Sequence, residues 1–271
     1  MPPSITVVGS VNLDLVARSE RQPRAGETVT DASFDRVPGG KGANQAVACA
    51  RLGARVRFVG AVGRDPFAAE ALAGLREAGV ELDLREVDEP TGVALILVDA
   101  TGENQIVVAP GANATLGAVE LPTSDAVLCQ LEIPDEAVAS AWEGTTGLFC
   151  LNAAPARPVA VDPDLTVVNR YELEALTRRD GLVAVTLGAE GAILLEDGEE
   201  VARAEPPPVT AVDGTAAGDA FTAALLVSLL EERPRDEALR RACAAGAIAA
   251  SRFGAQPSLP TADELDAILG P

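Results

Sequence analysis

Val209-Thr-Ala-Val212 leads into Asp213-Gly-Thr-Ala-Ala-Gly-Asp219, and Ala220-Phe-Thr-Ala-Ala-Leu-Leu-Val227 follows directly. This order predicts a strand, a loop of small residues and an apolar helix whose first turn contains Asp219. Small side chains let a ligand approach the backbone closely, and the unpaired N–H groups of a helix start favour negative charge. The stretch therefore has the character of a phosphate-binding loop in an α/β protein.

Asp219 allows two interpretations. An isolated Asp before an apolar helix is most often an N-cap, which contributes about 1 kcal/mol. A cap alone, however, does not need the three consecutive small residues that precede Asp219. Local sequence leaves the capping role and a catalytic role nearly even.

The rest of the chain alternates short β-branched runs with longer runs rich in Ala and Leu, which predicts βα units around a mostly parallel sheet. The predicted strands are Ile5–Val8, Val56–Val59, Ala126–Leu131, Leu148–Leu151, Leu165–Val168, Leu182–Thr186 and Ala192–Leu195. The predicted helices are Ala43–Leu52, Pro66–Ala78, Asp135–Trp142, Glu172–Thr177, Gly218–Glu231, Arg235–Ser251 and Ala262–Leu269. Asp65 before Pro66 is a strong helix start, because Asp accepts bonds from the first N–H groups and Pro fits the first turn.

Two stretches break this rhythm, residues 12–37 and residues 91–109. The second contains the runs Gly92–Val98 and Gln105–Ala109 on either side of turn residues, which is typical of a β-hairpin. We expect both stretches to form a small β-sheet lid, inserted in a single domain that spans residues 1–271. Open α/β folds bind ligands at the carboxyl ends of the sheet strands, so the lid would cover a site there.

The composition excludes several classes of function. A net charge of −20 without a local cluster of Lys and Arg opposes nucleic-acid binding. The absence of histidine removes Ser-His-Asp and Cys-His catalysis and His-ligated zinc. No apolar stretch reaches the roughly 18 residues of a membrane span, and no signal peptide is apparent. The cysteines lie far apart in apolar contexts, which indicates reduced core residues of a cytoplasmic protein; they are Cys49, Cys129, Cys150 and Cys243.

A second glycine-rich segment, Pro38-Gly-Gly-Lys-Gly-Ala-Asn44, opens another helix. It is not a Walker loop, because Gly42 stands where Ser or Thr should bind Mg²⁺. A simple turn capped by Asn44 would explain the glycines. Lys41, however, is the only lysine in a chain that otherwise uses arginine, and this favours a role for a compact ammonium group.

Three further features are candidate ligand-binding residues, but each alone is only weak evidence for a functional site. Asn12 and Asp14 follow the first strand and suit hydrogen bonds to polyol hydroxyls, although an Asx turn explains them almost as well. Asn169-Arg-Tyr-Glu172 could hold hydrated Mg²⁺ through Glu172, but this pattern is more often a helix start. Thr186-Leu-Gly-Ala-Glu-Gly191 is a strand followed by a two-glycine loop, which a tight turn explains equally well.

Taken in this order, the segments resemble the ribokinase-like (PfkB) family of carbohydrate kinases over nearly the whole chain. The segments that carry the resemblance are Gly9–Asp14, Gly39–Ala46, Pro110–Ala114, Gln130–Glu132, Leu151–Ala156, Asp213–Asp219 and Gly254–Pro260. The resemblance implies a three-layer α/β/α core with a mostly parallel sheet and a small β-sheet lid. It also implies ATP-dependent phosphorylation of a sugar primary hydroxyl, with conversion of D-ribose to D-ribose 5-phosphate as the expected reaction.

Alternative substrates in the same fold are fructose, ketodeoxygluconate or a nucleoside. The alternative from another class is a sugar-binding protein without catalytic activity. Gly39–Ala46 and the Gly254–Ser258 segment favour the ribose-phosphorylating members over fructokinase-like and nucleoside-kinase relatives.

The resemblance assigns roles residue by residue. Asp219 matches the catalytic base, and the backbone of Ala216, Ala217 and Gly218 matches an anion hole that faces the transferring phosphoryl group. Positions that match sugar contacts are Asn12, Asp14, Gly40, Lys41, Asn44 and Glu132, with Asp219 itself. Positions that match nucleotide contacts are Asn169, Thr186, Gly188, Gly191 and Gly218, with Cys243 near the adenine.

The resemblance also implies two metals and a dimer. Glu172 matches the residue that is associated with Mg²⁺ through water. Positions that match a monovalent cation site for K⁺ are Asp213, Thr215, Ala249, Arg252, Gly254 and Ser258, mostly through backbone carbonyls. The lid strands of relatives often pair between two subunits, which implies a homodimer.

Two departures from the family stand out. Gly214 occupies a place that is usually Thr, which we expect to loosen the cation loop. The stretch 173–185 is shorter than in relatives, and we expect this to affect nucleotide and Mg²⁺ binding.

Overall fold

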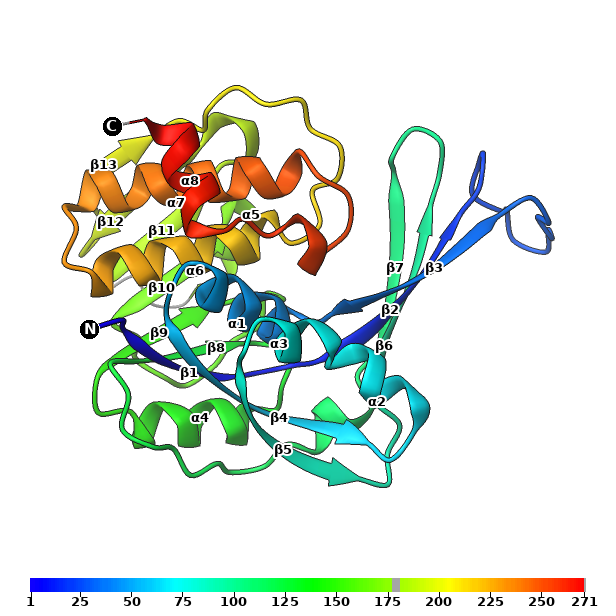
Figure 1. Ribbon diagram of the computed structural model, residues 1–271, viewed down its shortest axis with the longest axis horizontal. Helices are drawn as coiled ribbons and strands as arrows, with labels where there is room; N and C mark the ends of the chain where they lie inside the picture. The colour runs from blue at the N-terminus through cyan, green and yellow to red at the C-terminus, as the bar shows by residue number, and fades with distance from the viewer. Residues whose placement is uncertain (177–180, 271) are drawn as a thin grey trace.

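The computed structural model describes residues 1–176 and 181–270, and two sheets organise the chain (Figure 1). The larger sheet has the order β13-β12-β11-β10-β9-β8-β1-β4-β5. Its strands are β1 Ser4–Val8, β4 Arg55–Gly63, β5 Glu81–Val87, β8 Ala126–Gln130, β9 Leu148–Asn152, β10 Leu165–Asn169, β11 Leu182–Thr186, β12 Ala192–Glu196 and β13 Glu199–Ala204. Every neighbouring pair from β5 to β11 is parallel, and β12 and β13 are antiparallel. The predicted, mostly parallel α/β sheet is confirmed.

Helices cover both faces of this sheet, which makes three layers. They are α1 Lys41–Arg51, α2 Pro66–Ala71, α3 Ala73–Glu77, α4 Asp135–Gly144, α5 Arg170–Ala175, α6 Ala217–Leu230, α7 Arg235–Ala250 and α8 Ala262–Leu269, with the short 3-10 helices η1 Gly111–Thr115, η2 Gly188–Glu190 and η3 Gln256–Ser258. Successive strand residues point to opposite faces. Val7 of β1 therefore packs in the core with α1 and α6, whereas Val8 packs in a second core with α4.

The predicted helices are present to within about two residues at their ends, with one exception. Pro66–Ala78 was predicted as one helix, but Leu72 separates α2 from α3. Gly74 weakens a continuous helix here, and it packs so close to Gln256 that a Cβ would lie 1.9 Å from the amide oxygen. Asp65 caps α2 as predicted, accepting from the N–H groups of the second and third helical residues. Thr177, the last residue of another predicted helix, lies outside the described residues.

The predicted strand Val209–Val212 is wrong. This segment runs irregularly from β13 to α6, and Val209 and Val212 are exposed. The N–H of Val212 donates to the carbonyl of Ala250 at the end of α7, 2.8 Å away, rather than to a neighbouring strand. Proline has no N–H for a ladder, so the preceding run Pro206–Pro208 also keeps the chain out of the sheet.

A smaller sheet stands away from the body and forms the predicted lid (Figure 1). Its strands, in the order β3-β2-β6-β7, are β2 Asn12–Arg18, β3 Ser33–Gly39, β6 Gly92–Val98 and β7 Asn104–Ala109. Alternate residues give it two faces. Val16 and Ile96 are buried on the face toward the body, whereas Leu95 and Val107 are exposed on the other face.

Two properties concern the chain as a whole. In the part of the chain that the structure describes, no helix has the length and apolar character needed to cross a bilayer. All four cysteines are free and buried, as predicted for reduced core residues.

Candidate active site

Asp219 lies in the first turn of α6 but does not cap this helix. The N-cap is Ala216, which adopts a left-handed conformation with φ +61°, and Asp219 is the third helical residue. A left-handed conformation costs a non-glycine residue roughly 1–2 kcal/mol, and such strain is typical of functional sites. The capping interpretation of Asp219 is therefore wrong, and its carboxylate is free to interact elsewhere.

The carboxylate of Asp219 is buried against helix α1. Its Oδ2 accepts a hydrogen bond from Nδ2 of Asn44 at 3.0 Å, and its Oδ1 accepts one from Nε2 of Gln45 at 2.8 Å. Burial raises the pKa of Asp219 above its ordinary value, although the charge of Lys41 and the two amide donors oppose this rise. A carboxylate in this setting has a stronger affinity for a proton than an exposed aspartate.

A cavity of about 380 Å³ opens beside Asp219, between the lid and the carboxyl ends of the strands. It is lined by all seven residues predicted to contact a sugar, which are Asn12, Asp14, Gly40, Lys41, Asn44, Glu132 and Asp219. The lid contributes apolar side chains to the same cavity, among them Ile106 and Val108. Polar groups at the base and an apolar roof suit a small polyol.

The charged residues that line this cavity are one cation, Lys41, and four carboxylates, Asp14, Glu132, Glu172 and Asp219. Burial raises the pKa of Asp14 to about 7, and the carboxylates of Glu132 and Asp219 add to the effect. Burial alone would lower the pKa of Lys41, but Asp219, Glu132 and Glu172 outweigh it and raise that pKa. The only lysine of the sequence therefore stays charged in a partly buried position, which agrees with a role for its compact ammonium group.

The backbone brings the cavity residues close together. Gly40 precedes α1 with φ +87°, and a Cβ there would lie 2.8 Å from the backbone nitrogen of Asn12. Only glycine fits such a position. Glu132 is held by Ser10, whose Oγ donates to Oε2 at 2.5 Å, and by the N–H of Lys41 at 3.0 Å. Asn44, which was considered as a helix cap, lies inside α1 instead.

Several polar residues at this site were missed by the sequence analysis. Asn113 donates to Oδ1 of Asn12 at 2.8 Å and binds both backbone groups of Val11, so it fixes the start of the lid. Gln45, beside Asp219, is completely buried. The available signal was a set of amide side chains within otherwise apolar or glycine-rich segments, since buried amides need partners.

A second cavity, of about 530 Å³, lies on the other side of the α6 start. Of the residues predicted to contact the nucleotide, it is lined by Thr186, Gly188, Gly191, Gly218 and Cys243. Its remaining walls are mostly apolar, including Phe221 and the Pro206–Pro208 run. The two cavities share Thr186, Gly214 and Gly218. The first turn of α6 thus stands between a polar compartment and an apolar one.

Asn169 and Glu172 start helix α5 through reciprocal hydrogen bonds. Oδ1 of Asn169 accepts from the N–H of Glu172 at 2.9 Å, and Oε2 of Glu172 accepts from the N–H of Asn169 at 2.8 Å. Both residues line the 380 Å³ cavity. Within the described residues no group of three or more His, Cys, Asp or Glu could hold a metal ion. Since Oε2 of Glu172 is engaged at the helix start, Mg²⁺ bound beside these residues would be held through water.

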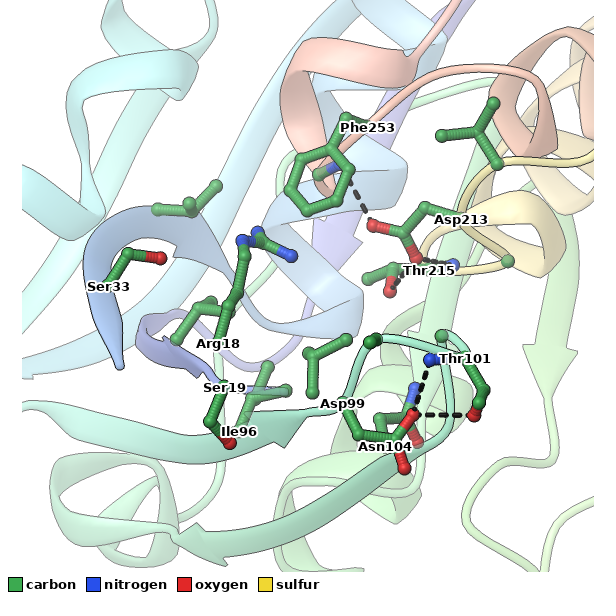
Figure 2. Close-up of a pocket in the computed structure, with 18 of the residues that line it drawn as sticks. Arg18, Ser19, Ser33, Ile96, Asp99, Thr101, Asn104, Asp213, Thr215 and Phe253 are labelled. Carbon is green, nitrogen blue, oxygen red and sulfur yellow. Dashed lines mark hydrogen bonds between the residues drawn. The ribbon is translucent and has the colours of Figure 1, made fainter. Parts of the chain in front are cut away.

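Asp213 joins the two loops that carry the predicted cation residues. Its Oδ1 accepts from the N–H and the hydroxyl of Thr215 at 2.9 and 2.6 Å, and its Oδ2 accepts from the N–H of Gly254 at 3.0 Å (Figure 2). Burial opposes ionisation, but these donors lower the pKa of Asp213 below its ordinary value. Because the carboxylate is already occupied, a cation would meet backbone carbonyls.

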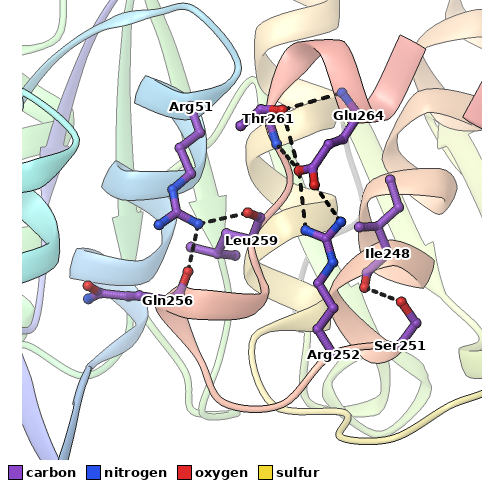
Figure 3. Close-up of polar contacts among 8 residues, drawn as sticks. All are labelled: Arg51, Ile248, Ser251, Arg252, Gln256, Leu259, Thr261 and Glu264. Atoms are coloured by element: carbon purple, nitrogen blue, oxygen red, sulfur yellow. Dashed lines mark hydrogen bonds and ion pairs between the residues drawn. The ribbon is translucent and has the colours of Figure 1, made fainter. Parts of the chain in front are cut away.

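Two arginines contribute hydrogen bonds and an ion pair around the second of these loops, which contains Gly254 and Ser258 (Figure 3). Arg51, the last residue of α1, donates to the carbonyls of Gln256 and Leu259, both at 2.8 Å. The guanidinium of Arg252 pairs with both carboxylate oxygens of Glu264. Because the guanidinium of Arg252 is bound to Glu264, its backbone carbonyl is the group that could contact the predicted cation.

Comparisons with known proteins identify the family. The family model described as pfkB family carbohydrate kinase matches residues 2–140 and 156–262. The chain belongs to this family. It is 38% identical to the ribokinase of Bacillus subtilis over 302 aligned residues, which cover 98% of this chain and 99% of that protein. The resemblance inferred from the motifs is confirmed.

Solved structures of the same family agree with this fold. A ribokinase from Thermotoga maritima superposes with a TM-score of 0.89 at 33% identity, covering 98% of this chain and 99% of its own. The ribokinase of Arabidopsis thaliana, solved in complex with ribose and ATP, superposes with a TM-score of 0.86 at 31% identity, with 99% of both chains covered.

The sequence predicts two departures from the pfkB family pattern, at Gly214 and in the stretch 173–185. A Cβ at Gly214 would meet no atom within 4 Å, so the loop has room for the threonine that is usual in the family. Gly214 also borders both cavities. Within the shortened stretch 173–185, helix α5 ends at Ala175 and residues 177–180 lie outside the described residues.

Proposed function

We propose that the chain transfers the γ-phosphoryl group of ATP to the primary hydroxyl of D-ribose, giving D-ribose 5-phosphate and ADP. The observation that carries the proposal is the position of Asp219, a buried carboxylate that lines the polar cavity directly after Gly218, which borders both the polar and the apolar cavity. Ribokinases of 30% identity or more support D-ribose as the acceptor, and so does the Arabidopsis thaliana complex with ribose and ATP.

Asp219 acts as the general base. It accepts the proton of the sugar hydroxyl as the oxygen bonds to phosphorus and the bond from phosphorus to the ADP oxygen breaks. Burial raises its pKa, so that its carboxylate has a greater affinity for the proton than an exposed aspartate has. Negative charge on the equatorial phosphoryl oxygens is met by backbone N–H groups at Ala216, Ala217 and Gly218 and by the start of α6.

The sugar is bound by its hydroxyl groups in the 380 Å³ cavity. Carboxylates accept hydrogen bonds from hydroxyls, and the ammonium of Lys41 donates them. The residues that we assign to this role are Asn12, Asp14, Gly40, Lys41, Asn44 and Glu132.

The nucleotide is placed in the 530 Å³ cavity, with the adenine near Cys243. A Cβ at Gly188 would meet nothing within 4 Å, so this glycine leaves open space beside the cavity. Mg²⁺, when bound with ATP, supplies charge neutralisation of the phosphates. Asn169 and Glu172 would hold it through water, and Thr186 lies at the junction of the two cavities.

A monovalent cation, K⁺, is proposed between the loop at Asp213 and the loop at Gly254. The carboxylate of Asp213 holds these loops together, and backbone carbonyls are suitable ligands for a large hard cation. The residues that we assign to this site are Asp213, Thr215, Ala249, Arg252, Gly254 and Ser258.

A homodimer through the lid is also proposed, with the whole chain acting as one kinase domain. The outward face of the lid exposes Phe34, Leu95, Leu97 and Val107. An apolar patch on a sheet face is typical of an interface. Free, buried cysteines support a reducing compartment, the cytoplasm.

Substitution of the base tests the reaction. Asp219→Asn keeps the shape of the side chain, and we expect turnover to fall by about 10²–10⁴-fold while calorimetry still detects D-ribose binding. Turnover close to that of the unmodified protein would reject Asp219 as the base.

A substrate panel tests the acceptor. ADP release is measured with pentoses, hexoses and nucleosides, each with and without K⁺. Activity highest on a nucleoside would reject D-ribose as the substrate, and absence of activity on every compound would favour a sugar-binding protein without catalysis.

A further inference from the structure

The carboxylate of Asp219 is hydrogen-bonded to Gln45, a residue that does not line the sugar cavity. Asn44 and Gln45 are consecutive in α1, and each donates to one oxygen of Asp219. Asn44 lines the cavity, whereas Gln45 is completely buried on the far side of the carboxylate. Gln45 therefore contacts the base but none of the space that a substrate would occupy.

Gln45 is itself fixed by two further amides. Its Nε2 donates to Oδ1 of Asn152 at 2.9 Å as well as to Asp219, and its Oε1 accepts from Nε2 of Gln130 at 2.7 Å. Asn152 in turn donates to the carbonyl of Val167 at 3.1 Å. Strands β8, β9 and β10 thus brace one side chain of α1.

The direction of these bonds leaves Gln45 one orientation. An ionised carboxylate only accepts hydrogen bonds, so the NH₂ group of Gln45 must face Asp219. Turning this amide would bring its oxygen against a carboxylate oxygen and would place two NH₂ groups together at Gln130. The side chain of Gln130 fits beside Gln45 because residue 9 is glycine: a Cβ at Gly9 would lie 2.2 Å from Oε1 of Gln130.

We propose that Gln45, braced by Gln130 and Asn152, is a positioning residue that sets the orientation of the Asp219 carboxylate for proton abstraction. This inference rests on the proposed function. The alternative partner for the carboxylate is the ammonium of Lys41, which interacts with it electrostatically inside the same cavity. A bond to a fixed amide holds Oδ1 in place, so that thermal rotation of the carboxylate toward Lys41 is opposed.

The same bond affects the protonation of the base. Besides Lys41 of α1, the charged groups that act on Asp219 or share its cavity are Glu132 after β8, Asp14 of β2 and Glu172 of α5. Gln45 stabilises the ionised form, because it donates to the carboxylate. Its loss should therefore move the acid limb of the kcat/KM profile to higher pH.

The test is Gln45→Leu, a change of similar volume that removes every polar contact. We expect kcat to fall by about 10- to 100-fold, KM for D-ribose to change by less than about threefold, and the acid limb to shift upward. A lower kcat with an almost unchanged KM indicates an effect on the transition state rather than on substrate binding.

Thr166→Val is the matched control. Thr166 is equally a buried polar residue of the large sheet, but it lies on the opposite face, beside the cavity between α4 and α5. We expect its kcat and pH profile to equal those of the unmodified protein, which separates the effect at Gln45 from a general cost of removing a buried polar group.

Gln130→Leu is the second variant, in case Gln45→Leu does not fold. It leaves the bond to Asp219 in place but removes its brace, so we expect a smaller fall in kcat, of about two- to tenfold, with the same direction of pH shift. Unchanged kcat and an unmoved acid limb in whichever variant folds would overturn the proposal. Absence of activity of the unmodified protein on every compound of the substrate panel would instead reject the proposed function itself, so the two failures are distinguishable.

Discussion

The guanidinium carbon of Arg18 lies 3.6 Å from the centre of the Phe253 ring. Arg18 is the last residue of lid strand β2, and Phe253 precedes Gly254 in the loop that Asp213 holds (Figure 2). A cation stacked on an aromatic ring contributes about 0.5–2 kcal/mol, depending on solvent exposure. The lid therefore touches the proposed cation loop directly, and this contact couples the two.

We expect Phe253→Leu to loosen this contact. The stacking contributes about 1 kcal/mol to holding the lid over the sugar cavity. Its loss should raise KM for D-ribose by about fivefold, and kcat should change less because Asp219 is unchanged. Steady-state kinetics gives both values, and hydrogen exchange in β2 reports the freer lid. Arg64→Met, which removes an exposed ion pair with Asp88 far from the lid contact, is the control. Unchanged KM and unchanged exchange in Phe253→Leu would show that the stacking does not position the lid.

The raised pKa of Asp14 predicts a pH-dependent stability. Between its ordinary value near 4 and its folded value of about 7, the unfolded chain has released the proton while the folded protein retains it. Rising pH then favours unfolding by up to about 1.4 kcal/mol per pH unit, and the effect stops above the folded pKa. Asp14→Asn removes this term, because asparagine does not titrate.

Urea unfolding of both proteins from pH 4.5 to 8 measures the effect. The free energy of unfolding of Asp14→Asn should exceed that of the unmodified protein by an amount that grows up to about pH 7 and then remains constant. All other titrating groups are common to both proteins. A difference that shrinks with rising pH would contradict the assignment of burial as the cause.

The elements with strong local signals were those that the sequence predicted. The core strands are β-branched and buried on both faces, so continuous apolar runs such as Leu165–Val168 identified them. β5 and β13 were missed, because their exposed edge positions are rich in charged residues. Val209–Val212 has strand-forming residues but lacks a neighbouring strand, and strand formation depends on such a partner.

The site residues also fall into those with a local sequence signal and those that only the packing of the chain brings together. Glycine-rich segments placed Lys41 and Asp219 next to a ligand, since small residues before a helix have a local meaning. The hydrogen bonds of Gln45 could not be predicted, because its partners lie 85 to 174 residues away from it in the chain. Only the packing of α1 against α6 and the sheet brings these amides together.

Gly214 is a position where the family residue should fit. Its surroundings leave room for a side chain, and its φ lies outside the left-handed region. Gly214→Thr should reduce the freedom of the unfolded chain and stabilise the protein by about 0.4–1 kcal/mol. We also expect half-maximal activation at a K⁺ concentration about two- to fivefold lower, because a stiffer loop needs less ordering when it binds.

The measurement is a K⁺ titration of the ADP release rate. Gly144→Thr, at the end of α4 away from both cavities, is the control and should leave the titration unchanged. A weaker response to K⁺ in Gly214→Thr would mean that the flexible loop is needed for activation.

The outward face of the lid predicts the assembly state. Val107 is 65% exposed and Leu95 is 50% exposed on adjacent strands. Val107→Glu places a charge within the proposed interface, where desolvation would cost several kcal/mol. We expect sedimentation to change from dimer to monomer. Val201→Glu at the outer strand β13, where Val201 is 41% exposed, is the control and should remain a dimer. A monomeric unmodified protein would contradict the proposal.

Arg51 should be among the polar residues that matter most for stability. Its guanidinium crosses from α1 to the loop after α7 and satisfies the carbonyls of Gln256 and Leu259 (Figure 3). Hydrogen bonds to charged groups contribute about 1.5–3 kcal/mol each, and partial exposure reduces this. We expect Arg51→Met to lower the free energy of unfolding by about 2 kcal/mol, measured by urea unfolding. Arg240→Met, which loses only an exposed pair with Asp236, should change it by less than about 0.5 kcal/mol. Equal losses in the two variants would show that the bridging carbonyls are satisfied by water instead, and that the loop at Gln256 is held by its own packing.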